Sequence, residues 1–230
     1  MCGRFSLTSP VEALQRLFGF TERPNLAPRY NIAPTTRISA IRLIEDKDEQ
    51  KPHHFAAHWG LIPSWAKSTE FSARMINARS ETVTEKPAFR TAYRSRRCLI
   101  PANSFFEWQE KEKGTKQPWL IGIDGMPLFA FAGLWENWTS PEGGNIDSCT
   151  ILTTIASDSI SFIHPRMPVI LEPSNYTIWL SGEAGTDILI PFKADRMRFH
   201  EVTNRVGNVR NDDADLLEPT APTETQRRLI

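Results

Sequence analysis

The chain has 230 residues, of which 40% are hydrophobic and 23% are charged, and its 27 basic side chains balance its 27 acidic ones. This length and composition predict one globular domain with a sizeable core. The zero net charge excludes a protein that binds nucleic acid through overall positive charge, so any anion site must be local.

The first predicted element is a short helix near the amino end of the chain. Ser9, Pro10 and Glu12 form a capping-box pattern with proline at the first helical position. The apolar residues of 11–18 then fall on one helical face, and Gly19 is suited to end the helix.

The remaining elements are mostly strands. The stretch 24–34 is punctuated by prolines and should be extended, and the runs 38–44 and 55–59 predict a hairpin around an acidic turn at 45–50. Further strands are expected at 98–100, 104–109, 119–123, 128–134, 149–154, 169–171 and 198–203. Further helices are expected at 86–93, 157–163 and 173–180.

These elements predict an α+β fold in which a mixed, mainly antiparallel β-sheet curls toward a barrel with a few peripheral helices. Residues 1–217 should form a single domain, and 218–230 a C-terminal tail. The longest apolar run, 126–135, is too short to span a bilayer, which predicts no membrane association.

The cysteines are odd in number and far apart in the sequence. Cys2, Cys98 and Cys149 have no C-x-x-C or Cys/His ligand spacing, so they predict neither a disulfide framework nor a metal site. We therefore expect a cytoplasmic protein without a metal or another cofactor.

Cys2 carries the most distinctive chemistry in the chain. Removal of Met1 would leave a 1,2-aminothiol, in which the α-amine and the thiol sit on adjacent carbons. The amine condenses with an aldehyde to a Schiff base, and the sulfur then closes on the imine carbon to form a thiazolidine. The alternative reading of Cys2 is a small, partly buried apolar residue.

Eight short motifs follow one another along almost the whole chain. They are MCGRF at 1–5, YNIAP at 30–34, WGLIP at 59–63, NARSET at 77–82, RCLIP at 97–101, FEW at 106–108, IHPRMP at 163–168 and VGNVRN at 206–211. Together they resemble the SOS-response-associated peptidase (SRAP) family of abasic-site processing proteins.

The resemblance implies a sensor of abasic sites in single-stranded DNA that shields the lesion during the DNA damage response. We expect this sensor to be a monomer and to act on the nucleoid. It implies a covalent cross-link between the DNA and Cys2 after Met1 is lost, and it brings lyase and self-processing peptidase activities into consideration. An abasic sugar opens to an aldehyde, which is the electrophile that a 1,2-aminothiol requires.

The resemblance also implies catalytic roles beside Cys2. Asn77 would hold the amine and the sulfur in attacking geometry, Glu107 would shuttle protons with a pKa raised by partial burial, and His164 would donate a proton or assist reversal. The residues alone leave other readings open, which are a turn-capping asparagine, an outward-facing strand carboxylate and a structural histidine.

The expected DNA contacts lie within the same motifs or in the loop that follows WGLIP. Arginine forks suit phosphate oxygens, and Trp65 with Pro63 would stack on bases or open the strand. These contacts are Arg4, Asn31, Pro34, Pro63, Trp65, Arg79, Arg166, Asn208, Arg210 and Asn211. Core or rim packing is expected for Trp119, Trp135 and Trp138.

Two other functions remain open from the sequence. In the first, Cys2 is the nucleophile of an N-terminal-nucleophile cysteine peptidase, with its own amine or His164 as the base. In the second, the protein binds single-stranded DNA without a covalent step and Cys2 is incidental. Peptide hydrolysis would favour the first, and a cross-link that is lost on Cys2→Ala would exclude the second.

Overall fold

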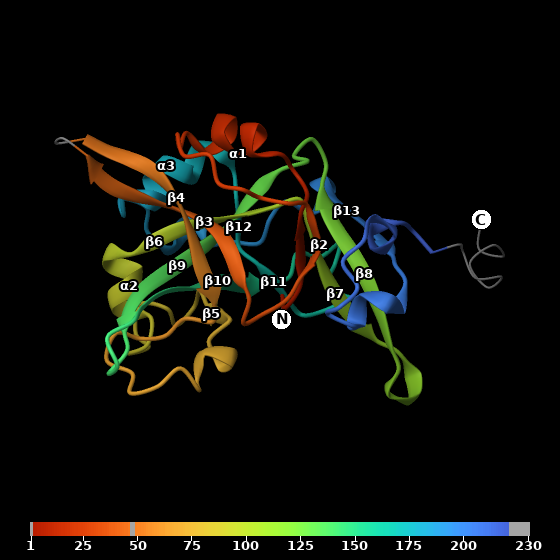
Figure 1. Ribbon diagram of the computed structural model, residues 1–230. Helices are drawn as coiled ribbons and strands as arrows, with labels where there is room; N and C mark the ends of the chain where they lie inside the picture. The colour runs from red at the N-terminus through yellow and green to blue at the C-terminus, as the bar shows by residue number, and fades with distance from the viewer. Residues whose placement is uncertain (1, 47–48, 221–230) are drawn as a thin grey trace.

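The computed structural model describes residues 2–46 and 49–220, and two β-sheets dominate it. Figure 1 shows a curled sheet on the left of the molecule and a second sheet on the right. The second sheet has five strands. The helices lie at the periphery of these sheets. The predicted α+β class, with a sheet curled toward a barrel, is confirmed.

The curled sheet contains a closed ring of five strands. The ring runs β10–β4–β3–β6–β9 and returns to β10; all its pairings are antiparallel except the parallel pair β4–β10. Closure leaves these strands without a free edge. The ring strands are β3 (Arg37–Asp46), β4 (Glu49–Trp59), β6 (Arg97–Ala102), β9 (Phe129–Thr139) and β10 (Asn145–Ile155).

Three short strands pair with β9 and β10 where these two strands continue past their neighbours in the ring. Two of them, β5 and β11, pair with β10, and the third, β12, pairs with β9. They are β5 (Asn77–Arg79), β11 (Arg166–Pro168) and β12 (Ile170–Leu171).

The second sheet is antiparallel throughout, in the order β13–β8–β7–β1–β2. Its strands are β1 (Phe5–Leu7), β2 (Arg29–Ile32), β7 (Ser104–Glu110), β8 (Lys116–Ile123) and β13 (Met197–Glu201). One face packs on the barrel, where the ring of Phe5 meets Trp59 and Phe131 at centroid distances of 5.2 Å and 5.7 Å. Aromatic packing therefore joins the two sheets into one core.

The other face of the second sheet is covered by the C-terminal part of the chain. Phe106 and Leu120 on this face form a separate buried cluster with Val202, Val206 and Leu216. Both faces of β7 are therefore covered.

The helices are short. The α-helices are α1 (Val11–Phe18), α2 (Arg90–Ser95) and α3 (Tyr176–Leu180). The 3-10 turns are η1 (Ser72–Arg74), η2 (Glu112–Gly114), η3 (Pro173–Asn175), η4 (Thr186–Ile188), η5 (Ala194–Arg196), η6 (Asn204–Gly207) and η7 (Ala214–Leu217). No helix in the described part of the chain is long and apolar enough to cross a membrane.

Helix α1 has the predicted bounds but not the predicted cap. Gly19 ends it with a left-handed φ of 77°. The capping box is wrong, because the N-cap residue is Pro10 and the Ser9 hydroxyl instead accepts a hydrogen bond from Asn103 Nδ2 at 2.7 Å.

Two other predicted helices and one turn also need correction. The helix predicted at 86–93 begins only at Arg90. Lys86 is disfavoured in helical geometry because it precedes Pro87, and residues 87–89 form turns. The segment 157–163 is a series of turns, because it must reverse the chain between the antiparallel strands β10 and β11. The turn predicted at 45–50 is shorter, since β3 runs to Asp46 and β4 begins at Glu49.

The start of the predicted C-terminal tail is attached to the second sheet. The Thr220 amide donates a hydrogen bond to the Glu201 carbonyl at 2.9 Å. Residues 221–230 of the predicted tail lie outside the described residues.

Candidate active site

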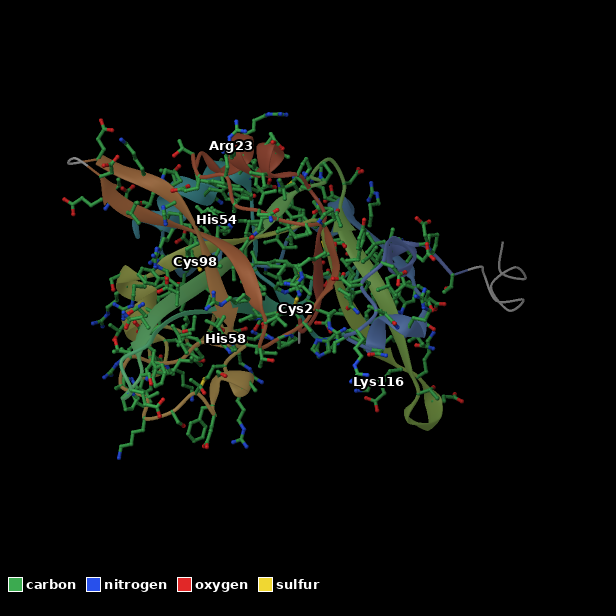
Figure 2. All side chains as sticks on the ribbon, in the orientation of Figure 1. Cys2, Arg23, His54, His58, Cys98 and Lys116 are labelled. Atoms are coloured by element: carbon green, nitrogen blue, oxygen red, sulfur yellow. The ribbon has the colours of Figure 1, made fainter. Side chains whose placement is uncertain are left out.

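Cys2 lies just before β1, at the junction of the two sheets (Figure 2). Its side chain is fully buried, and its thiol donates a weak hydrogen bond to the Arg4 carbonyl over 4.0 Å. Burial, together with the nearby charge of Glu107, raises the pKa of the Cys2 thiol well above its ordinary value. The sulfur is therefore held as a neutral thiol.

Asn77 approaches Cys2 from the barrel side. It is the first residue of β5 and pairs with Ile151 of β10. Its Nδ2 donates a hydrogen bond to the Cys2 carbonyl at 2.8 Å. Its Oδ1 is buried and has no hydrogen-bond partner among the described residues. Asn77 therefore fixes the Cys2 backbone and keeps an acceptor atom in the same place.

Glu107 approaches Cys2 from the second sheet. It lies on β7 on the same face as Phe105, which packs against Phe131 of the barrel, and it is only 3% exposed. The reading of Glu107 as an outward-facing carboxylate is wrong, because both faces of β7 are covered. Burial raises the pKa of Glu107 from its ordinary value of 4.5 to about 7. This carboxyl group is therefore suited to both accept and donate a proton at neutral pH.

His164 lies in the connection between β10 and β11. Its Nδ1 accepts a hydrogen bond from the Arg166 amide at 3.0 Å. The same Nδ1 also lies 3.0 Å from the Arg166 carbonyl oxygen, so this contact is compatible with either tautomer of the ring. Burial lowers the pKa of His164, which favours a neutral ring at pH 7. The charge of Lys116 also lowers this pKa, so the start of β8 lies near this histidine.

Both terminal nitrogens of Arg166 already have protein partners. Its guanidinium forms a forked ion pair with Glu81, at 2.6 Å and 3.0 Å, and donates to the Thr153 carbonyl at 2.7 Å. Only 14% of its side chain is exposed. The expected phosphate contact by Arg166 therefore competes with this ion pair.

Arg4 and Asn31 are also turned inward. Arg4 Nη1 donates to Asn31 Oδ1 at 2.7 Å and to the Val206 carbonyl at 2.8 Å, and Asn31 Nδ2 donates to the Asn211 carbonyl at 2.7 Å. Both side chains are buried. They hold the segment 206–211 against β1 and β2, and this placement disfavours the direct DNA contacts expected from the sequence.

The other expected DNA contacts differ in exposure. Pro63 is buried, so only Trp65, which is 68% exposed, is available for stacking in that loop. Pro34 and Asn211 are half-buried. The exposed polar candidates are Arg79, Asn208 and Arg210.

Sequence reasoning missed one neighbour of the site. Trp119 of β8 stands directly opposite Glu107 of β7. β7 and β8 form a hairpin around the turn at Gly114, in which Glu110 pairs with Lys116. Three residues further from the turn on each strand, the same register pairs Glu107 with Trp119, so the position of the turn in the sequence could have predicted this pair.

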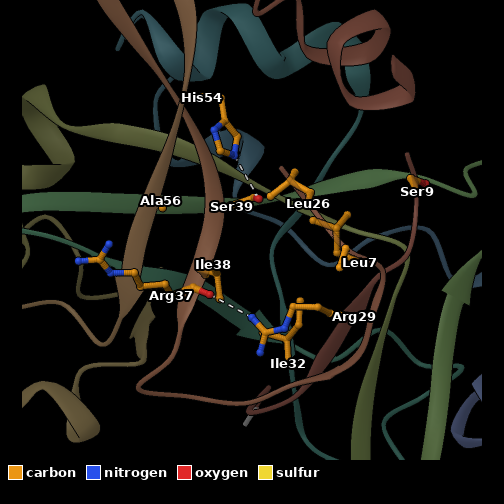
Figure 3. Close-up of a pocket in the computed structure, with 11 residues that line it drawn as sticks. Leu7, Ser9, Leu26, Arg29, Ile32, Arg37, Ile38, Ser39, His54 and Ala56 are labelled. Atoms are coloured by element: carbon orange, nitrogen blue, oxygen red, sulfur yellow. Dashed lines mark hydrogen bonds between the residues drawn. The ribbon is translucent and has the colours of Figure 1, made fainter. Parts of the chain in front are cut away.

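The pocket drawn in Figure 3 is separate from this site. It has a volume of about 190 Å³ and lies between β1, β2 and the hairpin β3–β4, with Leu7, Leu26 and Ile32 in its walls. The polar groups at its rim satisfy one another, since Arg29 donates to the Arg37 carbonyl at 3.0 Å.

Metal ligands do not gather around Cys2. Within residues 2–46 and 49–220, no three His, Cys, Asp or Glu side chains come close enough together to hold a metal ion. The three cysteines are free and buried.

Comparison with known proteins is consistent along the whole chain. The family model described as SOS response associated peptidase (SRAP) matches residues 1–209. The abasic site processing protein YoaM of Bacillus subtilis (strain 168) is 40% identical over 226 residues, which cover 95% of this chain and 98% of that protein. The abasic site processing protein HMCES of Rattus norvegicus is 30% identical over 288 residues, covering 100% of this chain and 81% of that protein.

A solved structure shares the fold. An X-ray crystal structure of a protein from Bacteroides thetaiotaomicron matches with a TM-score of 0.84 at 25% identity. The match covers 96% of this chain and 100% of the other.

Proposed function

Because the chain belongs to the SOS response associated peptidase family, we propose that it recognises abasic sites in single-stranded DNA and bonds to them through Cys2 once Met1 is removed. The similarity to abasic site processing proteins supports a role in abasic-site processing. The observation that carries the proposal is the convergence of Asn77 and Glu107 on Cys2.

The reaction joins one aldehyde and one aminothiol with loss of one water. The Cys2 amine attacks the aldehyde carbon of the opened sugar to give a carbinolamine, whose hydroxyl departs as water with a proton from Glu107 and leaves a protonated imine. The sulfur then forms a bond to the imine carbon, its proton passes to the Glu107 carboxylate, and the nitrogen keeps the proton that it already carries. The product is a thiazolidine.

Glu107 is suited to both proton transfers. With a pKa of about 7, the protonated carboxyl group can donate to the departing hydroxyl, and the carboxylate that remains can accept the thiol proton. The Cys2 thiol keeps its proton until that step because burial raises its pKa. Glu107 is therefore assigned the roles of both general acid and general base.

Asn77 and His164 have supporting roles in this proposal. The buried Asn77 Oδ1 is an acceptor for the free Cys2 amine, which would hold its lone pair toward the sugar. The neutral His164 ring can donate to the sugar hydroxyl or to a flanking phosphate when its proton is on Nε2.

The exposed candidates around this centre would hold the strand. Arg79 and Arg210 present forks suited to phosphate oxygens, and Trp65 presents a ring suited to a base. The proposal further assigns the protein to the cytoplasm, as a monomer on the DNA of the nucleoid.

The test is incubation of the protein with single-stranded DNA carrying one abasic site, beside an undamaged strand. We expect an adduct that survives a denaturing gel without borohydride, with the peptide mass locating it on Met-free Cys2. Cys2→Ala should lose it, and Glu107→Gln should slow it by about 10²-fold or more. Absence of an adduct from protein that has lost Met1 would overturn the proposal, and a shortened strand would reveal lyase activity.

Peptide hydrolysis by the Cys2 sulfur is the weaker alternative. A thiolate is the nucleophile of cysteine peptidases, whereas burial holds this thiol neutral. Release of fragments from added peptides by wild-type protein, and not by Cys2→Ala, would favour it.

A further inference from the structure

Three aromatic rings gather at the edge of the site, and the proposed chemistry uses none of them. Trp119 of β8, Phe199 of β13 and Phe162 of the turn before β11 form what we call the Trp119 cluster. Phe162 lies 5.3 Å from Trp119 and 5.6 Å from Phe199 between ring centroids, edge-on to the tryptophan at 89°. Although it packs on two rings, Phe162 is 48% exposed.

The Trp119 cluster is connected to the catalytic residues from two directions. Trp119 stands directly opposite Glu107 in the β7–β8 ladder, and residues paired in this way project from the same face of a sheet. Phe162 precedes His164 by two residues. The exposed Phe162 ring therefore lies on the turn that carries His164, and its partner Trp119 lies on the strand beside Glu107.

Trp119 is held in place and can support Phe162. Its Nε1 donates to Gln109 Oε1 at 3.2 Å, and its ring also lies 5.9 Å from Phe199. The turn carrying Phe162 is closed by hydrogen bonds from the Ile163 amide to the Ile160 carbonyl and from the His164 amide to the same oxygen. Little ordering would be needed when Phe162 meets a ligand.

The Trp119 cluster offers a ligand aromatic carbon rather than charge. Its three rings carry no ionisable group, and the neighbouring Lys111 already lies 3.5 Å from Glu201. Lys116, labelled in Figure 2, begins β8, and its charge reaches His164. The Phe162 ring is therefore suited to the face of a base rather than to a phosphate.

We propose that Phe162 stacks on the nucleobase next to the abasic sugar. This inference rests on the proposed function for its choice of ligand. The missing base leaves its neighbour with one unstacked face, and an aromatic side chain can cover that face without reading its sequence. Trp119 supports Phe162 from below and is a positioning residue.

The test uses a DNA strand whose lesion cannot react. A tetrahydrofuran analogue lacks the aldehyde, and 2-aminopurine placed on its 5′ or 3′ side reports stacking through its fluorescence. Wild-type protein should quench one of the two positions. Phe162→Ala should lose that quenching and bind about 5- to 100-fold more weakly. Phe162→Trp should keep the affinity and deepen the quenching.

A matched control is Ile44→Ala, which removes another exposed apolar side chain, on the barrel hairpin. Its affinity and quenching should equal those of the wild type. Equal binding and quenching by Phe162→Ala, or no quenching by the wild type on either side, would overturn the proposal. The covalent chemistry is tested by a different result. If no adduct forms with aldehyde-bearing DNA but Phe162 still stacks on the analogue, the covalent proposal is wrong and the stacking proposal stands.

Discussion

At the scale of single residues, Glu107 influences the protonation of Cys2. Both are buried, and the carboxylate charge of Glu107 opposes formation of the Cys2 thiolate. With a pKa of about 7, Glu107 changes its charge within the range where the protein would work. The site is therefore sensitive to modest changes in pH.

This arrangement predicts a pH-dependent stability. The native pKa of Glu107, about 7, lies above its ordinary value of 4.5, so the native state binds the proton more tightly than the unfolded state. The contribution of Glu107 to the free energy of unfolding is fully present below about pH 4.5 and is lost as the pH rises to about 7. The wild type should therefore lose on the order of a few kcal/mol of stability between pH 5 and pH 8, and Glu107→Gln should not. Urea unfolding at these two pH values measures the difference.

The control for that experiment lies on the same strand. Glu110 is exposed at the end of β7, and Glu110→Gln should leave the pH slope of the wild type unchanged. An unchanged slope in Glu107→Gln as well would show that Glu107 titrates normally in the folded protein.

Substitutions of a buried and an exposed arginine should have different effects, one on stability and the other on DNA binding. Arg4→Ala removes buried hydrogen bonds to Asn31 and Val206, and should lower the free energy of unfolding by about 3 kcal/mol. Arg79→Ala, at an exposed position, should change stability by less than about 0.5 kcal/mol and weaken DNA binding most at low salt. Urea unfolding measures the stability of each variant, and DNA titration at two salt concentrations measures its affinity. If Arg4→Ala weakened DNA binding without a loss of stability, Arg4 would be the DNA contact.

At the scale of elements, the loop after β4 depends on one glycine. Gly60 has a φ of 142°, and a Cβ atom there would lie 2.5 Å from the Ser72 carbonyl oxygen. Its amide donates to the Cys149 carbonyl of β10 at 2.9 Å. The close approach of η1 to the end of β4 therefore requires glycine, and it fixes the start of the loop that exposes Trp65.

Gly60→Ala should consequently destabilise the protein. We expect a loss of about 2–4 kcal/mol, from the φ penalty and from displacement of η1, measured by urea unfolding. Gly144→Ala is the matched control, because a Cβ atom at Gly144 would meet nothing within 4 Å, and its effect should stay below about 0.5 kcal/mol. Equal stability of the two variants would contradict the steric argument.

At the scale of the whole molecule, the C-terminal part of the chain completes the site region. Val206 and Leu216 are fully buried against the second sheet, and Arg4 and Asn31 bond to carbonyls of 206–211. The last turns are thus structurally tied to the strand that follows Cys2. One domain over 1–217, as predicted from the sequence, requires that all these parts unfold together.

Truncation tests this dependence. Ending the chain at Thr203 uncovers Phe106 and Leu120, and should lower the Tm by more than about 10 °C or abolish cooperative unfolding. Ending it at Thr220 keeps the hydrogen bond to Glu201, and should leave a single transition within about 2 °C of the wild type. Calorimetry measures both, and two separate transitions in the full chain would contradict a single domain.

The sequence by itself determined the local elements and the chemistry of the amino end. Periodicity and Gly19 correctly bounded α1, and alternating apolar runs indicated most strands of both sheets. The ordered motifs were enough to indicate the family, which the match over residues 1–209 confirms. These features are readable because each depends on neighbours within a few residues.

Only the tertiary structure decided which partners meet. The parallel pair β4–β10 that closes the barrel joins strands distant in the sequence, and no local pattern specifies it. Alternation along β7 defined its two faces but could not show that both are covered, which is what buries Glu107 and raises its pKa. Likewise Arg4 forms its hydrogen bonds inside the protein because the chain returns more than 200 residues later to supply the Val206 carbonyl. Burial and pairing between distant segments depend on how the whole chain folds, and therefore they appear only in the folded molecule.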